Sequence, residues 1–191
     1  MCLYRKKLTS GEWIYILIYV DDMILVCKDG QEIAALERAL REHFDISSLG
    51  EITQFIGIQV HRDKQGMYAL SQRSLIREVA LRFKLGDAKT SKYPIDPGYY
   101  RQEEGSALPD NIEYRKLIGA LLYISTNSRP DTAAAISILS RKCTSPTQRD
   151  WVELKRVVRY LIGTQDYTLS LASNREQPLE LTGFSDADFA G

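Results

Sequence analysis

The chain has 191 residues, with 25 Lys and Arg balanced by 25 Asp and Glu, and 44% of its residues are hydrophobic. This composition excludes a wholly disordered chain and fits one globular domain or two small ones. The zero formal charge excludes a generally basic nucleic-acid binder, so such a surface would need local clustering of charge. No apolar run has the length of a membrane span. The three scattered cysteines, Cys2, Cys27 and Cys143, favour neither a disulfide framework nor a zinc site, so we expect a soluble intracellular protein.

Three consecutive antiparallel strands are predicted at the start of the chain, over Cys2–Arg5, Trp13–Ile18 and Met23–Lys28. Asp21 and Asp22 interrupt the apolar run between the second and third strands. Because an unpaired carboxylate is costly to bury, we expect both acids at the tip of a β-hairpin, aimed toward one spot. Such a pair suits a divalent metal, although a solvated turn is the ordinary role of Asp-Asp.

A helix is predicted over about Gln31–His43, because apolar residues recur there at helical spacing. Asp29 stands in its N-cap position, and Glu32 is the second half of a capping box. A second hairpin is then predicted from Phe55–Val60 and Met67–Leu70.

The first strand of that second hairpin contains Gly57. A glycine inside a strand weakens it unless another backbone approaches closely, and a nucleic-acid backbone would be one such visitor. A bulge or tight packing is the alternative.

The next helix is predicted over about Gln72–Phe83, with Ser71 as its cap. It leaves Arg73, Arg77 and Arg82 largely on the outside, and a solvated face is the usual role of such arginines.

The second half of the chain begins with a linker that has several Gly and Pro residues. Three short helices then form a small bundle, with Asp110 and Asp131 as caps. The helices are predicted over Ile112–Thr126, Thr132–Arg141 and Gln148–Ile162, followed by strands over Thr168–Leu171 and Leu179–Phe184. The fold class is therefore α+β: an antiparallel sheet with packed helices, a helical bundle and a short terminal β segment.

Several motifs together resemble one family. Tyr19-Val20-Asp21-Asp22 resembles the Tyr-x-Asp-Asp box of reverse transcriptases, and Phe55-Ile56-Gly57-Ile58 resembles their Phe-Leu-Gly-Ile box. The runs Tyr114–Tyr123 and Ser128-Arg129-Pro130-Asp131 look very like copia-type sequence. The chain thus resembles, over nearly its whole length, the C-terminal part of a copia-type LTR retrotransposon reverse transcriptase.

The resemblance implies that Asp21 and Asp22 are catalytic ligands of Mg²⁺, or of Mn²⁺, in two-metal nucleotidyl transfer. Asp21 would bridge the metals and Asp22 would support it. Asp186 resembles the first metal-binding acid of an RNase H domain, whose other acids are missing, so we expect no RNase H activity.

The resemblance also implies partners: an RNA or DNA template-primer and deoxynucleoside triphosphates, with no membrane. The residues with implied contacts to the primer are Tyr19, Phe55, Ile56 and Gly57, and those with implied contacts to the nucleic-acid backbone are Arg73, Arg77 and Arg82.

The resemblance implies four parts of the chain. Residues 1–84 are a partial palm with a primer-grip hairpin and the following helix, and residues 85–110 are a linker. Residues 111–165 are a helical thumb, and residues 166–191 are a connection with the first strand of a truncated RNase H domain.

A complete polymerase has fingers and another catalytic Asp upstream, so we expect little or no activity from this chain alone. The alternatives are a retained transposon remnant that binds nucleic acid or protein without catalysis, and a gene-model fragment without independent function. The resemblance implies an intracellular location, cytoplasmic in a virus-like particle or nuclear.

Overall fold

The computed structural model describes residues 2–101, 105–171 and 183. The strands are β1 (Cys2–Lys7), β2 (Trp13–Tyr19), β3 (Asp22–Val26), β4 (Gln54–Phe55), β5 (Ile58–Arg62), β6 (Tyr68–Ser71) and β7 (Leu169–Ser170). The helices are α1 (Gly30–Arg41), α2 (Arg73–Arg82), α3 (Ile112–Asn127), α4 (Ala133–Ser140) and α5 (Gln148–Gly163), with 3₁₀ turns η1 (Tyr99–Arg101) and η2 (Pro130–Thr132). Antiparallel sheets with packed helices confirm the expected α+β class.

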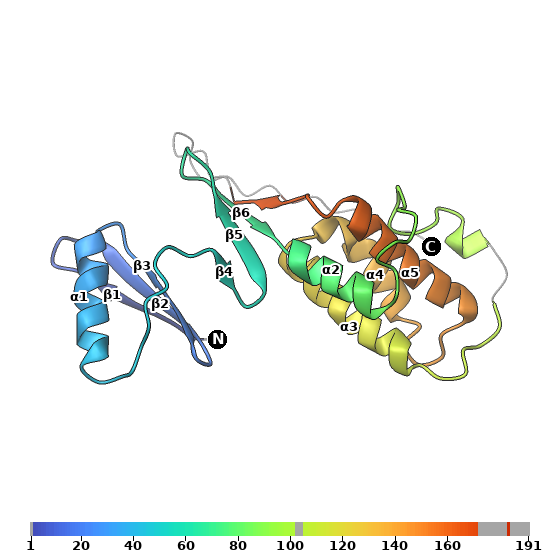
Figure 1. Cartoon of the computed structure of the whole chain (residues 1–191), viewed down its shortest axis with the longest axis horizontal. Coiled ribbons are helices and arrows are strands. Elements are labelled where there is room, and N and C mark those ends of the chain that lie inside the picture. Colours follow the sequence, from blue (N-terminus) through green and yellow to red (C-terminus); the bar gives the residue numbers. More distant parts are fainter. Residues whose placement is uncertain (1, 102–104, 172–182, 184–191) are drawn as a thin grey trace.

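The first sheet has the order β1-β2-β3, as its three predicted strands required. It lies with α1 at one end of the molecule, whereas α2, α3, α4 and α5 lie at the other end (Figure 1). The predicted cap of α1 is present, because the Asp29 carboxylate accepts a hydrogen bond from the Gln31 amide at 2.8 Å. Among the described residues of the first sheet and α1, only Ile14 is buried, so the main core lies elsewhere.

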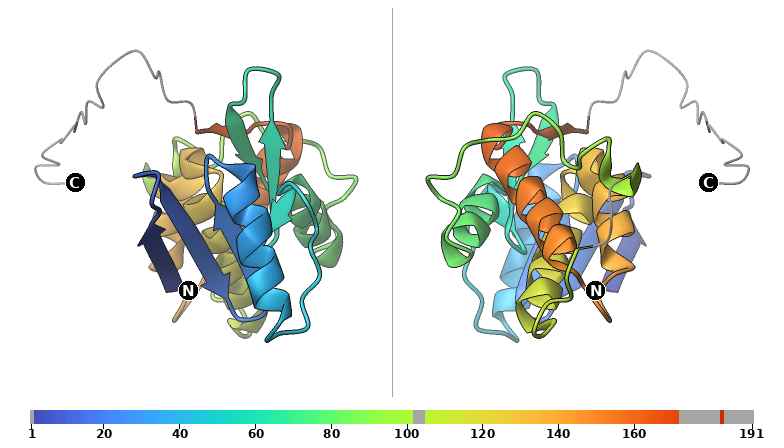
Figure 2. Two further views of the ribbon diagram at one scale, coloured as in Figure 1. Left: turned by 90° about the vertical axis from the view of Figure 1, so that its left-hand side faces the viewer. Right: turned by 90° about the vertical axis from the view of Figure 1, so that its right-hand side faces the viewer.

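The second sheet has the order β4-β5-β6-β7 and connects the two ends of the molecule. Figure 2 shows the hairpin of β5 and β6 projecting beyond the helices. Two strands were predicted after α5. The first, Thr168–Leu171, contains β7, and the second, Leu179–Phe184, lies largely outside the described residues.

The core is formed by the helices, with side chains from α2, α3, α4 and α5 in one buried cluster. Leu117, Leu121, Leu154 and Val157 are fully buried in it. The predicted apolar stripes of α3 and α5 therefore do face one another, and the predicted helical bundle is present.

Three helix starts differ from the prediction. Ser71 ends β6 and its hydroxyl lies 2.9 Å from His61 Nε2, so Gln72 stands at the N-cap of α2. Asn111 takes that position in α3, but it makes no side-chain cap hydrogen bond, and the predicted Asp110 carboxylate accepts from the Ile112 amide at 2.9 Å. Asp131 lies inside η2 and binds Arg129 in place of capping a helix, because the buried guanidinium is the stronger partner.

The Pro- and Gly-containing segment before α3 is anchored along α5. The backbone amide of Asp96 donates to the Glu153 carboxylate at 2.8 Å, and the Tyr99 hydroxyl donates to Asp150. Burial, followed by the hydrogen bond to Asp150, raises the pKa of Tyr99 above its ordinary value. This segment was predicted as a linker, and its contacts make it part of the helical unit.

Candidate functional site

The two adjacent acids lie at the tip of the β2–β3 hairpin. Tyr19 pairs with Asp22, so Val20 and Asp21 form a two-residue turn, which we call the acid turn. Val20, at the first position of the turn, has a positive φ of 52°. A β-branched residue in this left-handed region costs about 1–2 kcal/mol, so the long strands on both sides must hold the turn. The predicted placement of both acids at a hairpin tip is confirmed.

Both carboxylates are exposed, and within the described part of the chain neither takes part in an ion pair or a side-chain hydrogen bond. Magnesium prefers oxygen ligands and commonly takes one or two protein carboxylates together with substrate phosphates. The donor set therefore fits such an ion. Among the described residues no group of three or more His, Cys, Asp or Glu could hold a metal, so the acids form a pair rather than a complete cage.

A second tight turn lies between β4 and β5. Phe55 pairs with Ile58, which leaves Ile56 and Gly57 as the two central residues of what we call the grip turn. Their φ values are 44° and 79°, the two positive positions of a type I′ turn.

The prediction that Phe55–Val60 is one strand with Gly57 in its interior is therefore wrong. A Cβ on Gly57 would meet no atom within 4 Å, so the glycine is required by the positive φ of the turn and not by close packing against the rest of the chain. The turn lacks the usual Asn-Gly or Asp-Gly signal, which is why the sequence did not reveal it.

A residue that the sequence did not single out joins these turns. The hydroxyl of Tyr123, on α3, donates a hydrogen bond to the backbone carbonyl of Ile56. Burial, and then the nearby phenol of Tyr19, raises the pKa of Tyr123 above its ordinary value. Figure 1 shows the end of the first sheet that bears the acid turn directed toward the grip turn.

Of the predicted residues, Asp21 lies in the acid turn, with Tyr19 and Asp22 at the strand ends that flank it, and Ile56 lies in the grip turn. Tyr123 binds Ile56 and interacts electrostatically with Tyr19. The available signal for Tyr123 was its place beside the buried stripe of α3, since a partly buried phenol usually needs a hydrogen-bond partner. Phe55 ends β4 immediately before the grip turn and is partly buried.

The three predicted backbone-binding arginines lie at exposed positions of α2 and already have partners. Arg73 lies 3.0 Å from Asp166, and Arg82 lies 3.0 Å from Glu78. Arg77 Nε donates to the Gln165 side chain at 2.9 Å. Arg73 and Arg77 therefore connect α2 to the segment after α5, and a phosphate would have to displace these weaker surface contacts.

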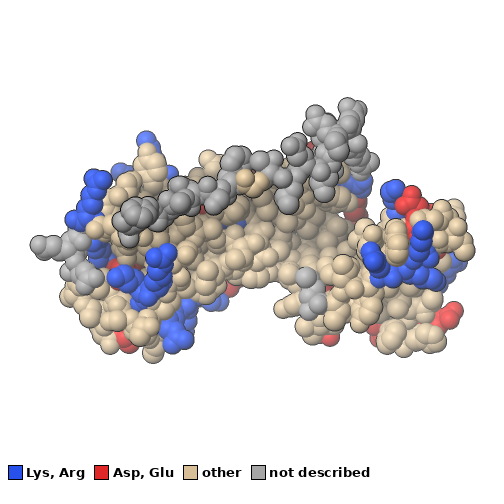
Figure 3. All heavy atoms as spheres, turned by 180° about the vertical axis from the view of Figure 1, so that it is seen from behind, with Lys and Arg blue, Asp and Glu red and all other residues tan. Residues whose placement is uncertain are grey.

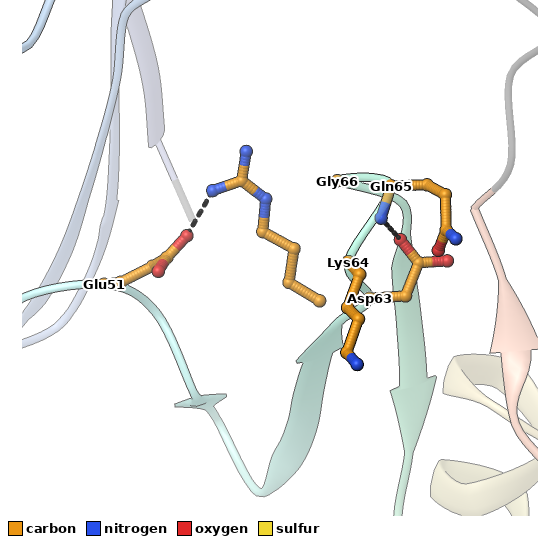
Figure 4. A pocket seen from close by; sticks show the side chains of 6 residues that line it. Glu51, Asp63, Lys64, Gln65 and Gly66 are labelled. Atoms are coloured by element: carbon orange, nitrogen blue, oxygen red, sulfur yellow. Dashed lines mark hydrogen bonds and ion pairs between the residues drawn. The ribbon is translucent and has the colours of Figure 1, made fainter.

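Other charged features of the described chain do not extend this site. Figure 3 shows basic side chains at both ends of the visible face, with a largely uncharged surface between them. At the β5–β6 turn, Arg62 pairs with Glu51 at 2.5 Å, and Asp63 accepts from the Gln65 amide at 2.9 Å (Figure 4). This exposed hollow is an ordinary Asx turn with a surface ion pair.

Asp186, the predicted RNase H ligand, lies outside the described residues.

A family model described as reverse transcriptase (RNA-dependent DNA polymerase) matches residues 1–97. The chain therefore belongs to the reverse transcriptase family. Its relatives among transposon Pol polyproteins assign it to the copia-type retrotransposon group, as the motifs had indicated.

The chain is 32% identical over 201 residues to the retrovirus-related Pol polyprotein from transposon TNT 1-94 of Nicotiana tabacum, a match that covers 100% of this chain and 15% of the tobacco protein. It is 35% identical over 179 residues to the corresponding polyprotein from transposon RE2 of Arabidopsis thaliana, covering 93% of this chain and 12% of that protein. An uncharacterised mitochondrial protein of Arabidopsis thaliana is 31% identical over 178 residues, covering 93% of this chain and 72% of the plant protein.

The chain thus spans only 12% to 15% of the length of these Pol polyproteins. No solved structure matches it significantly. Among the described helices, none combines the length and apolar character needed to cross a bilayer.

Proposed function

We propose that this chain is the palm and thumb part of a polymerase that makes DNA on an RNA or DNA template, and that Asp21 and Asp22 are its metal ligands. The single observation that supports this most is the acid turn. Together with the strand residue that follows it, this turn presents two carboxylates that have no other described partner.

Each of these residues would have a separate role. Asp21, inside the turn, would be the main ligand of the metal, and Asp22, at the start of β3, would support it. Bound magnesium would stabilise charge on the triphosphate and activate the primer 3′ hydroxyl. The grip turn would orient the primer end, and Tyr19 would pack beside it.

Metal binding can be tested without catalysis. Mn²⁺ added to the chain should broaden the backbone resonances of residues 19–23 first, because a paramagnetic ion acts on nearby nuclei. Asp21→Asn should abolish that selective broadening. Asp45→Asn is the matched control, since Asp45 is exposed and has no described partner. Equal broadening in wild type and Asp21→Asn would refute the assignment of the ligands.

Primer extension then separates the enzyme from the remnant. Extension of a recessed 3′ end with Mg²⁺, lost in Asp21→Asn and kept in Asp45→Asn, would support a polymerase. Binding of template-primer that weakens with salt, without any extension, would support a non-catalytic nucleic-acid module, because phosphate contacts release counterions. Because we expect little extension from this chain alone, the assay is run on the chain joined to the fingers and upstream catalytic segment of a copia-type relative, and the Asp21→Asn and Asp45→Asn variants are compared in that combined protein.

A further inference from the structure

We propose that Tyr123 is a positioning residue for the primer: its hydroxyl fixes the grip turn to α3, so that this turn and the thumb helix hold the primer end as one unit beside the acid turn. The proposal rests on the proposed polymerase function. Tyr123 would act indirectly, through the grip turn, and would touch neither the metal ligands nor the reacting atoms.

The first argument is that the grip turn cannot hold its own shape well. Ile56 is β-branched and has a φ of 44°, a conformation that L-residues with branched side chains rarely adopt. The turn is closed by two residue pairs between β4 and β5, Gln54 with Gln59 and Phe55 with Ile58, and by one more backbone hydrogen bond, from the Val60 amide to the Thr53 carbonyl at 2.8 Å. A hydrogen bond to the carbonyl of the strained residue is therefore placed where outside support is needed.

The second argument concerns what holds Tyr123. Its neighbours Leu121 and Ile124 are fully buried in the helical core. Its own backbone carbonyl accepts a hydrogen bond from the Asn127 side chain at 2.7 Å. The Tyr123 hydroxyl is therefore held by a helix that packs in the main core. In contrast, Ile14 is the one buried residue among the described residues of the first sheet and α1.

The third argument is that the same phenol lies near the acid turn. Tyr19, directly before Val20 and Asp21, is close enough to raise the pKa of Tyr123, after the larger effect of burial. The hydroxyl that donates to Ile56 on the grip turn therefore also interacts electrostatically with Tyr19, the residue directly before the acid turn.

The test uses Tyr123→Phe, which removes the hydroxyl and keeps the ring. Hydrogen exchange of a peptide that covers residues 53–60 should become about two- to tenfold faster, the effect of losing one neutral hydrogen bond, while exchange in α5 stays the same. Tyr100→Phe is the matched control, because Tyr100 is exposed and its hydroxyl has no described hydrogen bond. The thermal unfolding midpoint shows that each variant is folded.

A second measurement distinguishes positioning from a merely structural role. Tyr123→Phe should weaken binding of a template-primer with a recessed 3′ end about two- to tenfold, and should leave binding of a blunt duplex of equal length unchanged. Unchanged exchange over residues 53–60, or an equal loss for both DNAs, would overturn the proposal. If wild-type protein binds neither DNA, the proposed function fails and this role fails with it. If wild-type protein prefers the recessed DNA and Tyr123→Phe binds it equally well, only the role of Tyr123 is refuted.

Discussion

Replacing Asp131 with Asn should destabilise the helical unit by leaving a buried guanidinium without its charge partner. Arg129 is 2% exposed, and its Nε and Nη2 donate to the two carboxylate oxygens of Asp131 at 2.9 and 2.6 Å. Its remaining nitrogen donates to the Thr164 carbonyl at 3.0 Å, and its guanidinium lies over the Tyr160 and Tyr167 rings. The ion pair therefore joins η2 to the end of α5.

Breaking a fully buried ion pair by removing one partner costs about 3–5 kcal/mol. The Asp131 side chain is 35% exposed, so water hydrates part of the freed charge. We therefore expect a smaller loss of about 2–3 kcal/mol in the free energy of unfolding, measured by urea denaturation at neutral pH.

The matched control is Asp166→Asn, which breaks the exposed ion pair with Arg73 and should cost only about 0–1 kcal/mol. A loss for Asp131→Asn no larger than that of the control would refute the claim that this pair stabilises the fold.

The same pair predicts how stability depends on pH. Burial alone would raise the pKa of Asp131, but hydrogen bonds from Arg129 and Tyr160 outweigh it and lower the pKa below its ordinary value. Because the carboxyl binds protons less readily in the folded state, its contribution is present above the unfolded pKa and is lost as pH falls through the folded one. The difference in stability between wild type and Asp131→Asn should therefore shrink below about pH 4.

Two further predictions concern backbone conformation, and each is measured by urea denaturation. Gly57→Ala should lower the free energy of unfolding by about 1–2 kcal/mol, because the φ of Gly57 is 79°. Gly119→Ala is the control: this glycine lies inside α3 with open space where a Cβ would stand, and the change should raise the free energy of unfolding by about 0.5–1 kcal/mol. Equal effects of the two changes would show that the positive φ does not matter. Val20→Gly should be neutral or stabilise by up to about 1 kcal/mol, because relief of strain exceeds the entropic cost of glycine; a clear loss of stability would show that the Val20 side chain supports the turn.

The sequence predicted best what depends on local patterns. Runs of β-favouring residues identified β1, β2 and β3 and put Asp21 and Asp22 at a hairpin tip. Helical spacing identified α5 from Gln148 almost to its last residue. These features depend on neighbours within a few positions, which the chain order displays directly.

What the sequence missed depends on residues far apart or on turns without their usual signal. The hydrogen bond from Tyr123 joins residues 67 positions apart, and no local pattern indicates it. Asp131 follows Pro130 as a capping residue would, yet Arg129 takes its carboxylate because a buried charge must be paired. The site was thus predictable as a set of motifs and not as an arrangement.

The two turns of the site are supported in different ways, so a movement of α3 should affect them differently. The acid turn ends a long hairpin in which β2 and β3 share five paired positions, so its strained Val20 is held by the sheet itself. The grip turn has two such pairs, one further backbone hydrogen bond from Val60 to Thr53, and one hydrogen bond from α3. Because the weaker ladder depends on Tyr123, a displacement of α3 should alter the grip turn before it alters the geometry of Asp21 and Asp22. In the proposed polymerase, thumb position would thereby control where the primer end lies while the metal ligands stay in place.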